Sequence, residues 1–318
     1  MEPNEINDIA PSALTHIIGQ KSVVAQVAVA LEAAFADGKK FDSALLIGPP
    51  GVGKSALARV IADEMAAQLH EVLGQSIASP ADLNTLLLSA KDQDIIHIDE
   101  AHELDKTYQT ALYLAVDQRR ISLQGGRSGR GPQSLPLADF TLLLSTTDEY
   151  CLLQPLRDRM KLLLRFDFYT AEELTEILRH RSRALNWKVD EKVLPQIAAR
   201  SRGTPRLALR LLQSCRRVCR SEGEIAITLA HLDRACGLEQ IDPLGLGPTE
   251  QQYLGILCEG DTRLNVIASR LGLPARTVSQ VAEPFLIRAG LVTKDDQGRR
   301  QLTGEGRAHL SKNRANGV

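Results

Sequence analysis

The sequence predicts an α/β fold with a phosphate-binding loop over residues 1–168, followed by an all-α lid over 169–241 and a winged helix over 242–318. The α/β prediction rests on two apolar runs, 44–47 and 94–98, each followed at once by polar or glycine-rich residues, as buried parallel strands are. The lid is predicted because only helical patterns are found from residue 171 to residue 236. A Pro- and Gly-rich stretch at 242–248 then marks a boundary before the last domain.

Residues 48–55, GPPGVGKS, lie between the strand pattern 44–47 and a helical pattern at 56–65. This is the strand, GxxxxGK[ST], helix arrangement of a phosphate-binding loop. Glycines let successive backbone N–H groups point at one anion, and the helix N-terminus adds positive potential. Lys54 supplies a full charge, and Ser55 can place its hydroxyl on a magnesium ion. The alternative, a glycine turn with an incidental lysine, is disfavoured by the flanking strand and helix.

Two acids, Asp99 and Glu100, follow the second apolar run. They are expected at the carboxyl edge of the sheet, where ligands bind in open α/β folds. Asp99 would hold magnesium, and Glu100 would act as the general base that polarises the attacking water. An isolated pair of acids after a strand is more often a solvated turn. The upstream loop favours the chemical interpretation, because phosphoryl transfer needs both parts together.

The cysteine pattern and the absence of sorting signals bear on the compartment. Five scattered cysteines form no CxxC pair and no Cys/His cluster, which indicates a reducing environment without disulfides or a zinc site. Cys215 and Cys219 are interpreted as core thiols one helical turn apart. No stretch has the length of a membrane span, and the N-terminus has no basic, apolar signal pattern. We therefore expect a cytoplasmic protein with no membrane partner.

A formal net charge of −1 means that contact with nucleic acid must come from local basic patches. The candidates are residues 118–138 with four arginines and no acid, residues 192–221 with seven arginines and no acid, and residues 262–318 with ten basic residues against four acidic ones. In the first patch, the runs 121–124 and 133–137 flank a Gly/Ser/Arg tip that includes Arg127 and Arg130. This predicts a projecting hairpin. For this hairpin, contact with phosphate and a plain surface turn are equally good interpretations.

Further elements complete the predicted first domain. Helical patterns cover 21–35, 81–90 and 107–116, the second capped by Ser79 or Asp82, and a third buried strand covers 140–144. The residues after that strand, STTD at 145–148, offer a hydroxyl that could orient the water aimed at a γ-phosphate. The segment PLRDR at 155–159 precedes an apolar run at 162–168. Its arginines fit a salt bridge or an arginine finger, which in trans is worth roughly a thousandfold or more in rate.

The lid is predicted as helices at 171–186, 191–200, 204–220 and 229–236. Thr170 is the expected N-cap of the first, and Glu173 completes a capping box. Pro205 lies in the first turn of the third helix with Arg206 just inside. A helical lid can swing such an arginine onto bound phosphates.

Helical patterns at 249–257, 264–271 and 275–289 are followed by two short strands, 290–293 and 300–302, around a charged turn. Three helices and a hairpin are the pattern of a winged helix. Winged helices bind proteins as well as DNA, so the fold does not fix the partner.

From about residue 17 to residue 310 the chain resembles AAA+ ATPases and, among them, the RuvB family of Holliday junction branch-migration motors. The resemblance is carried by IIGQ (17–20), GPPGVGKSALARVIADEM (48–65), IDEAHEL (98–104), LRDR (156–159), FDFYT (166–170), SRGTPRLALRLL (201–212) and AEPFLIRAGLV (282–292). The last three segments separate this family from other AAA+ branches. The resemblance implies an AAA+ P-loop sheet domain, a helical lid and a winged helix.

The resemblance also implies cofactors and residue roles. ATP would be held by Gly48, Gly51, Gly53, Lys54, Ser55, Ala56 and Tyr169, and Mg²⁺ by Ser55 and Asp99. Glu100 would activate water, Thr146 would be the first sensor, Arg159 the finger that reaches a neighbouring subunit's ATP, and Arg206 the sensor of the γ-phosphate in the lid. Lys294 and Arg299 match wing positions where the family places basic residues on DNA. Such phosphate contacts would be sequence-blind and strongly dependent on salt.

The implied function is an ATPase and DNA helicase that works as a homo-oligomeric ring, expected to be a hexamer, on branched or duplex DNA, with a RuvA-like junction-binding partner. The chain also departs from the family. The hairpin that docks RuvA is here rich in glycine and arginine, and Asp295-Asp296-Gln297 replaces a more basic wing turn, which weakens backbone contact by like-charge repulsion. The alternatives are a clamp-loader-like AAA+ switch and an ATP-gated scaffold for a protein partner.

Overall fold

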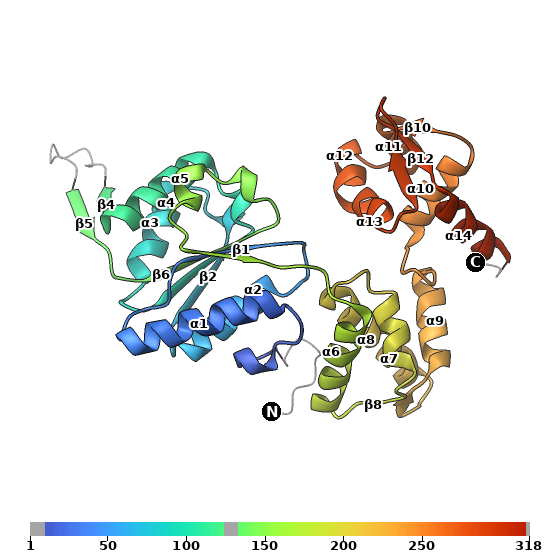
Figure 1. The fold of residues 1–318 in the computed structure, drawn as a ribbon, viewed down its shortest axis with the longest axis horizontal. Coiled ribbons are helices and arrows are strands. Elements are labelled where there is room, and N and C mark those ends of the chain that lie inside the picture. Colours follow the sequence, from blue (N-terminus) through green and yellow to red (C-terminus); the bar gives the residue numbers. More distant parts are fainter. Residues whose placement is uncertain (1–9, 124–132, 316–318) are drawn as a thin grey trace. The chain divides into compact units, whose positions relative to one another are not determined.

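The computed structural model describes residues 10–123 and 133–315. The chain divides into two compact units, Met1–Glu173 and Leu174–Val318 (Figure 1), which are described separately below. The tip of the predicted hairpin, with Arg127 and Arg130, lies outside the described residues.

The first unit is built on a five-stranded parallel sheet in the order β2-β3-β6-β1-β7. Its strands are β1 (Ala44–Ile47), β2 (Leu69–Leu73), β3 (Ile95–Asp99), β6 (Thr141–Thr146) and β7 (Leu162–Arg165). The register pairs Ile47 with Thr146 and Leu73 with Asp99. The loops that follow β1, β3 and β6 therefore leave the same edge of the sheet.

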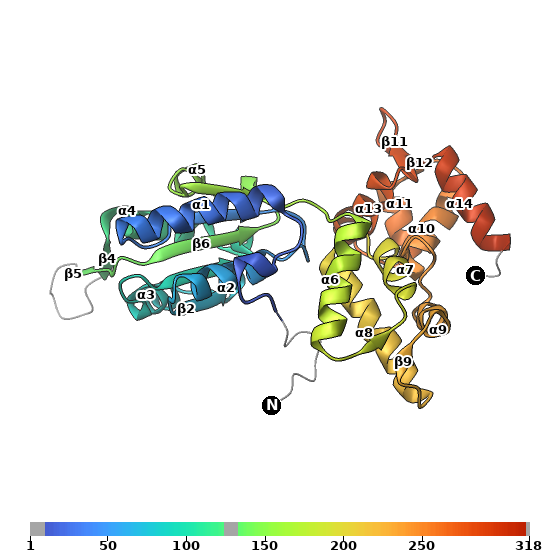
Figure 2. The ribbon, with the colours of Figure 1, turned by 60° about the horizontal axis from the view of Figure 1, so that its bottom comes forward.

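Helices accompany this sheet, and a separate two-stranded hairpin precedes β6. In both ribbon views α1 lies alongside the sheet (Figures 1 and 2). The helices are α1 (Lys21–Asp37), α2 (Lys54–Glu64), α3 (Pro80–Ser89), α4 (Lys106–Gln118) and α5 (Gln154–Arg157), with 3-10 turns η1 (Leu14–His16), η2 (Gly74–Ser76), η3 (Ala101–Glu103) and η4 (Glu149–Cys151). The hairpin strands are β4 (Arg120–Leu123) and β5 (Gln133–Pro136), paired antiparallel.

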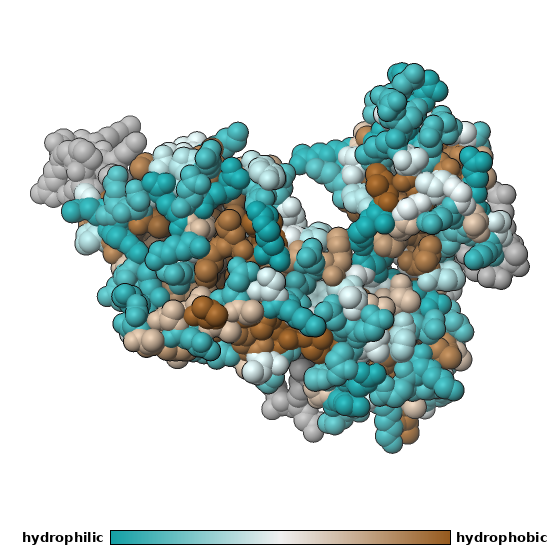
Figure 3. All heavy atoms as spheres, in the orientation of Figure 1, coloured by the Kyte–Doolittle hydropathy of each residue, from teal (hydrophilic) through white to brown (hydrophobic). Residues whose placement is uncertain are grey.

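Part of α1 leaves apolar side chains in solvent. Val29 is 66% exposed and Phe35 is 56% exposed. On the face drawn in Figure 3, hydrophobic residues gather where Figure 1 draws α1. The opposite side of the helix is buried through Val23, Val27 and Leu31, so α1 has apolar residues on more than its core-facing side.

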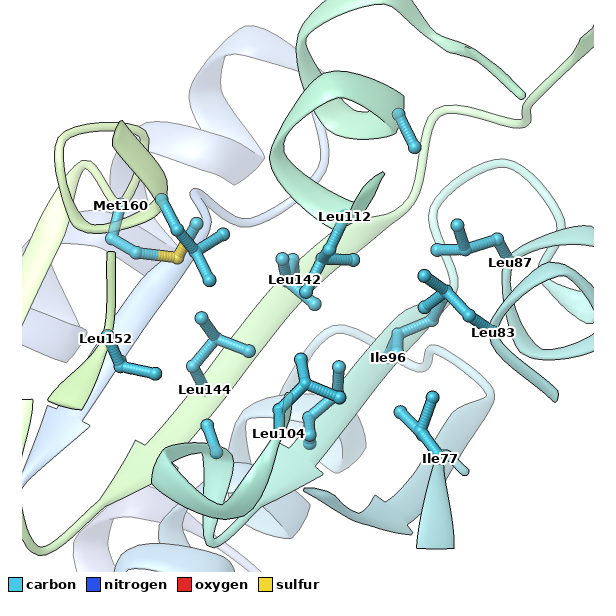
Figure 4. Close-up of a cluster of buried hydrophobic side chains, with 14 of the residues drawn as sticks. Ile77, Leu83, Leu87, Ile96, Leu104, Leu112, Leu142, Leu144, Leu152 and Met160 are labelled. Carbon is cyan, nitrogen blue, oxygen red and sulfur yellow. The ribbon is translucent and has the colours of Figure 1, made fainter. Parts of the chain in front are cut away.

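The sheet is buried on both faces. Alternate strand residues such as Leu45 and Ile96 pack with α3 and α4, and their neighbours Leu46 and Ile95 pack with α1 and α2. Figure 4 shows the first cluster, in which Leu83 and Leu87 of α3 face the sheet. Burial on both faces explains why these strands are continuous apolar runs rather than alternating patterns.

One strand of the sheet escaped prediction. β2 lies at the edge and is only half-buried, with His70 and Glu71 in its middle. Its mixed polarity matches neither a buried run nor a clean alternation, so the sequence pattern does not identify it. The strands and helices that were predicted for this unit are observed, with ends displaced by a few residues, as is usual for such boundaries.

The second unit begins with four lid helices. They are α6 (Ala171–Ala184), α7 (Val193–Ala199), α8 (Pro205–Ser221) and α9 (Leu229–Glu239), with a short parallel pair β8 (Lys188–Val189) and β9 (Ala226–Ile227). The capping box that starts α6 is confirmed: the Thr170 N–H donates to Glu173 Oε2 at 2.9 Å, and the Glu173 N–H donates to Thr170 Oγ1 at 3.2 Å. All five cysteines are free, and Cys215 and Cys219 are fully buried core thiols. Burial raises the pKa of Cys215 to about 12.

The remainder of the unit is a winged helix, as predicted. It contains α10 (Pro248–Cys258), α11 (Leu264–Leu271), α12 (Ala275–Thr277), α13 (Glu283–Arg288) and α14 (Gly304–Ala315), and a sheet ordered β10-β12-β11 from β10 (Thr262–Arg263), β11 (Val292–Lys294) and β12 (Arg299–Leu302). β11 and β12 project as the wing (Figure 2). Among the described residues no helix combines the length and hydropathy that a membrane span requires.

Two features of this domain differ from the sequence prediction. The single helix expected at 275–289 is interrupted by a π-helical segment, η5 (Val278–Ala282). Pro284 follows it closely and has no N–H with which to continue an α-helical ladder, which accounts for the irregular turn. The C-terminal helix α14 was missed because its sequence is polar and carries Gly304 and Gly306 in its first turn.

Candidate active site

The loop after β1 has the backbone geometry of a phosphate cradle. Gly48 has φ +157° and Gly53 has φ +101°, values that L side chains rarely adopt, and a Cβ on Gly48 would lie 2.7 Å from the Phe166 carbonyl oxygen. The Leu57 N–H donates to the Gly53 carbonyl at 3.0 Å. Ser55 and Ala56 therefore lie in the first turn of α2, whose N–H groups have no intrahelical acceptor and favour an anion.

Lys54 is buried, with 6% of its surface exposed. Its Nζ donates to the carbonyl oxygens of Gly48 at 2.8 Å and Pro49 at 2.9 Å. The ammonium group is thus held inside the curl of its own loop, where it can reach phosphate oxygens that enter the cradle.

The loop and the acidic strand meet at one point, as the sequence predicted. Ser55 Oγ donates to Asp99 Oδ2 at 2.7 Å, and Asp99 Oδ1 accepts from the Glu100 N–H at 2.9 Å. A hydroxyl and a carboxylate are the hard oxygen ligands that Mg²⁺ takes alongside substrate phosphates. The donor set at this edge of the sheet therefore fits that ion.

Glu100 follows Asp99 in a left-handed backbone conformation, with φ +49°. Its carboxylate is 40% exposed, and Oε2 lies 3.4 Å from Nδ1 of His102. A carboxylate that is in solvent, next to the magnesium ligands and on a fixed turn can reach a water molecule. It has the setting that a general base needs.

Thr146, the expected first sensor, is fully buried. Its Oγ1 donates to the Asp148 carbonyl and accepts from the Asp148 N–H, both at 3.0 Å, and it lies 3.2 Å from His102 Nδ1. The hydroxyl therefore shapes the turn after β6. Thr147, the next residue, is exposed at the same edge of the sheet. The segment STTD pointed to a hydroxyl here, but sequence reasoning did not select Thr147.

Tyr169 reaches the phosphate loop from the end of the unit. Its hydroxyl donates to the Val52 carbonyl at 3.1 Å, and burial raises its pKa to about 12. Beside it, Gln20 Nε2 donates to the Asp167 carbonyl at 2.7 Å, and the Asp167 N–H donates back to Gln20 Oε1 at 3.1 Å. The N-terminal IIGQ segment and the FDFYT segment thus form one wall next to the cradle.

Arg159, the expected finger, lies against α4. Its Nη2 pairs with Asp117 Oδ2 at 3.1 Å, Nη1 donates to the Pro155 carbonyl at 2.8 Å, and the guanidinium lies 4.9 Å from the centre of the Tyr113 ring. Its side chain is 30% exposed. Arg206 belongs to the second unit, where it is exposed in the first turn of α8.

The two predicted DNA contacts in the wing differ in their surroundings. Lys294 Nζ pairs with Glu283 Oε2 at 3.0 Å, whereas Arg299 is exposed and its Nη2 donates to Gln297 Oε1 at 2.7 Å. Glu283 is buried and also accepts from Arg300 Nε at 2.6 Å. Burial alone would raise the pKa of Glu283, but hydrogen bonds from Arg300 and Lys294 outweigh it and lower that pKa. Lys294 therefore has a structural partner inside the domain.

A cluster in the lid has the composition of a metal site but not its proton arrangement. Glu222, Glu224 and His231 bring their ligand atoms within 4.8 Å of one another. His231 Nδ1 accepts from the Thr228 N–H at 2.9 Å, so the ring proton lies on Nε2 and faces the two carboxylates at 3.0 and 3.2 Å. The cluster is a cap at the start of α9.

Three family models cover nearly the whole chain: the P-loop domain of the Holliday junction DNA helicase RuvB over residues 9–166, the RuvB AAA lid domain over 169–242, and the RuvB C-terminal winged-helix domain over 243–311. The chain belongs to the RuvB family. The fold class predicted from the sequence is thereby confirmed.

Individual RuvB proteins match along their length. The Holliday junction branch migration complex subunit RuvB of Kosmotoga olearia is 34% identical over 318 residues, which cover 98% of this chain and 92% of that protein. The subunit of the same name from Prochlorococcus marinus is 34% identical over 314 residues, or 97% of this chain and 89% of that protein. Among solved structures, the Thermotoga maritima RuvB Holliday junction branch migration motor matches with a TM-score of 0.83 and 33% identity, covering 95% of this chain and 98% of that one. A mutant of the same Thermotoga maritima protein gives a TM-score of 0.85 at 32% identity, covering 95% of this chain and 99% of that one.

Proposed function

We propose that this member of the RuvB family hydrolyses ATP in a ring to drive the branch migration of Holliday junctions. The observation that carries the proposal is the Ser55 Oγ to Asp99 Oδ2 hydrogen bond of 2.7 Å, next to the loop that holds Lys54. It joins the phosphate cradle to the acidic strand, which are the two parts that phosphoryl transfer requires together. The names of its relatives, as subunits of a branch migration complex, give the substrate class.

In this proposal the first unit binds and orients the nucleotide. The nucleotide-binding residues are Gly48, Gly51, Gly53, Lys54, Ser55, Ala56 and Tyr169. Mg²⁺, held by Ser55 and Asp99, supplies charge neutralisation to the transferred phosphoryl group when bound. Glu100 accepts the proton of the attacking water at a carboxylate oxygen. Thr147, exposed beside the buried Thr146, presents the hydroxyl that orients this water, while Thr146 fixes the turn.

Two arginines complete the site from outside the first unit's own cradle. Arg206 would contact the γ-phosphate from the lid, and Arg159 would leave Asp117 and Tyr113 to reach the ATP of a neighbouring subunit. Positive charge from such a finger stabilises the transition state. An oligomer follows from this requirement, and from the family we infer that it is a hexameric ring. Exposed apolar residues on α1 and on the edge strand β7, where Leu163 is 45% exposed, offer contact area for neighbouring subunits.

We infer that the wing contacts the DNA backbone chiefly through Arg299, because Lys294 already forms an ion pair with Glu283. Asp295 lies close by and uses Oδ1 to accept from the N–H groups of Gln297 at 2.9 Å and Arg299 at 2.7 Å.

A RuvA-like protein is the inferred loading partner, and the scattered free cysteines support a cytoplasmic location. We place the functional boundaries of the lid at 169 and 241, with the first domain and the winged helix on either side.

The proposal is tested by measuring ATP hydrolysis and branch migration on a synthetic four-way junction, with and without a RuvA-type protein. We expect the junction to stimulate hydrolysis and Lys54→Ala to abolish nucleotide binding. Hydrolysis per subunit should fall as the protein is diluted below its assembly concentration. Hydrolysis that is indifferent to DNA at low salt would support a scaffold instead, and reject the motor.

A further inference from the structure

We propose that His102 is a positioning residue that holds the Glu100 carboxylate and connects it to Thr146 on the neighbouring strand. His102 lies in η3, the 3-10 turn directly after β3, and its side chain is 19% exposed. Its Nδ1 is 3.4 Å from Glu100 Oε2 and 3.2 Å from Thr146 Oγ1. The inference rests on the proposed role of Glu100 as the general base.

The position of the ring proton follows from the hydrogen bonds of Thr146. A threonine hydroxyl has one proton to donate, and Thr146 Oγ1 has the Asp148 carbonyl at 3.0 Å as its acceptor. The same oxygen accepts from the Asp148 N–H. We therefore assign the remaining contact of 3.2 Å to donation by the ring, which places the proton on Nδ1.

The same Nδ1 also lies 3.4 Å from a carboxylate oxygen of Glu100, which can only accept. One donor thus has two acceptors, Thr146 and Glu100, which come from different strands of the sheet. When the ring N–H donates to Glu100, this hydrogen bond limits the rotation of the carboxylate. When Glu100 turns to a water molecule, Thr146 keeps the ring oriented.

His102 contributes little to the core of the domain. Its neighbours in the turn, Ala101 and Leu104, are buried in the apolar cluster against the sheet, whereas the imidazole is not part of it. A substitution that removes the ring should therefore leave the fold intact. Its effect should be on the rate of the chemical step.

The variants His102→Asn, His102→Gln and His102→Ala separate positioning from packing. An asparagine amide lies where Nδ1 was, and a glutamine amide lies where Nε2 was. We expect His102→Ala and His102→Gln to lower kcat by roughly tenfold or more, a part of the ~10²- to 10⁴-fold that a general base contributes. The KM for ATP and the melting temperature should stay unchanged, and His102→Asn should recover most of the activity. In a Glu100→Gln background, His102→Ala should have no further effect.

The ring nitrogens give a readout that does not depend on hydrolysis. In the full chain without nucleotide, the ¹⁵N shifts of His102, assigned by comparison with His102→Gln, should show a protonated Nδ1. An unprotonated Nδ1, or a His102→Gln variant more active than His102→Asn, would overturn the inference. Wild-type turnover in Glu100→Gln alone would instead reject the proposed general base, so the two failures are distinct.

Discussion

Arg202 and Glu250 form an ion pair at 2.7 Å between the turn that precedes α8 and the first helix of the winged domain. Both side chains are largely buried, at 17% and 11% exposure. Arg202 Nε also donates to the Gly245 carbonyl at 2.7 Å, and its guanidinium lies 5.0 Å from the centre of the Phe285 ring. The SRGTPR turn is thus fixed to the winged helix at one end and carries Arg206 at the other.

Removing Arg202 should destabilise the second unit. In an Arg202→Met variant the Glu250 carboxylate stays buried without its partner, and breaking such a pair costs about 3–5 kcal/mol. The free energy of unfolding from urea titration measures this. Arg270→Met is the matched control, because the Arg270–Glu259 pair is exposed, at 43% and 64%, and surface pairs contribute roughly 0–1 kcal/mol. Equal losses in the two variants would contradict the prediction.

Arg159→Ala should retain ATP binding and lose turnover, by roughly a thousandfold or more if the residue is a finger in trans. Within its own subunit Arg159 contacts Asp117 and Tyr113 of α4 and not the phosphate cradle, so nucleotide binding by that subunit should be little affected. The decisive measurement mixes Arg159→Ala with Lys54→Ala. The first supplies an intact cradle and the second supplies the finger, so the mixture should hydrolyse ATP although neither variant does alone. If the mixed variants form rings but do not hydrolyse ATP, Arg159 is not the finger.

The cradle and the acidic strand could be predicted from the sequence because each is a local pattern whose geometry follows from its own residues. Gly48 and Gly53 allow the backbone conformation of the phosphate loop, and the apolar strand β3 places Asp99 at the edge of the sheet. The role of His102 and the surroundings of Lys294 could not be predicted. Both depend on partners in another secondary-structure element, Thr146 in β6 for the first and Glu283 in α13 for the second, and no local period encodes such pairs.

Acidification should destabilise the first unit through His97, a histidine buried in the middle of β3. Its Nε2 lies 2.8 Å from Ser145 Oγ and its Nδ1 lies 3.3 Å from Glu71 Oε1. Burial lowers the pKa of His97, despite the carboxylates of Asp99 and Glu71, from the ordinary 6.5. Below pH 6.5 the unfolded chain binds a proton that the folded chain does not, so stability is present above that pH and falls beneath it. The slope is at most about 1.4 kcal/mol per pH unit.

Urea titrations of the wild type and His97→Leu between about pH 7.5 and about pH 5.5 check this, since the variant lacks the proton site. Its stability should fall less over the interval. His16→Gln, a change at an exposed ring, is the control and should keep the wild-type slope. If the free energy of unfolding falls equally with pH in the wild type and His97→Leu, other groups cause the loss of stability in acid.

Arg299 and Lys294 should differ in their effect on DNA binding although both are basic residues of the wing. Arg299→Ala removes an exposed charge and should reduce the slope of log affinity against log salt by about one, equally for all sequences. Lys294→Ala should change that slope less, because the ammonium is held 3.0 Å from the Glu283 carboxylate, which it shares with Arg300. Titration of a duplex and a four-way junction at several salt concentrations measures both slopes. A larger change for Lys294→Ala than for Arg299→Ala would contradict this prediction and would mean that DNA takes Lys294 away from Glu283.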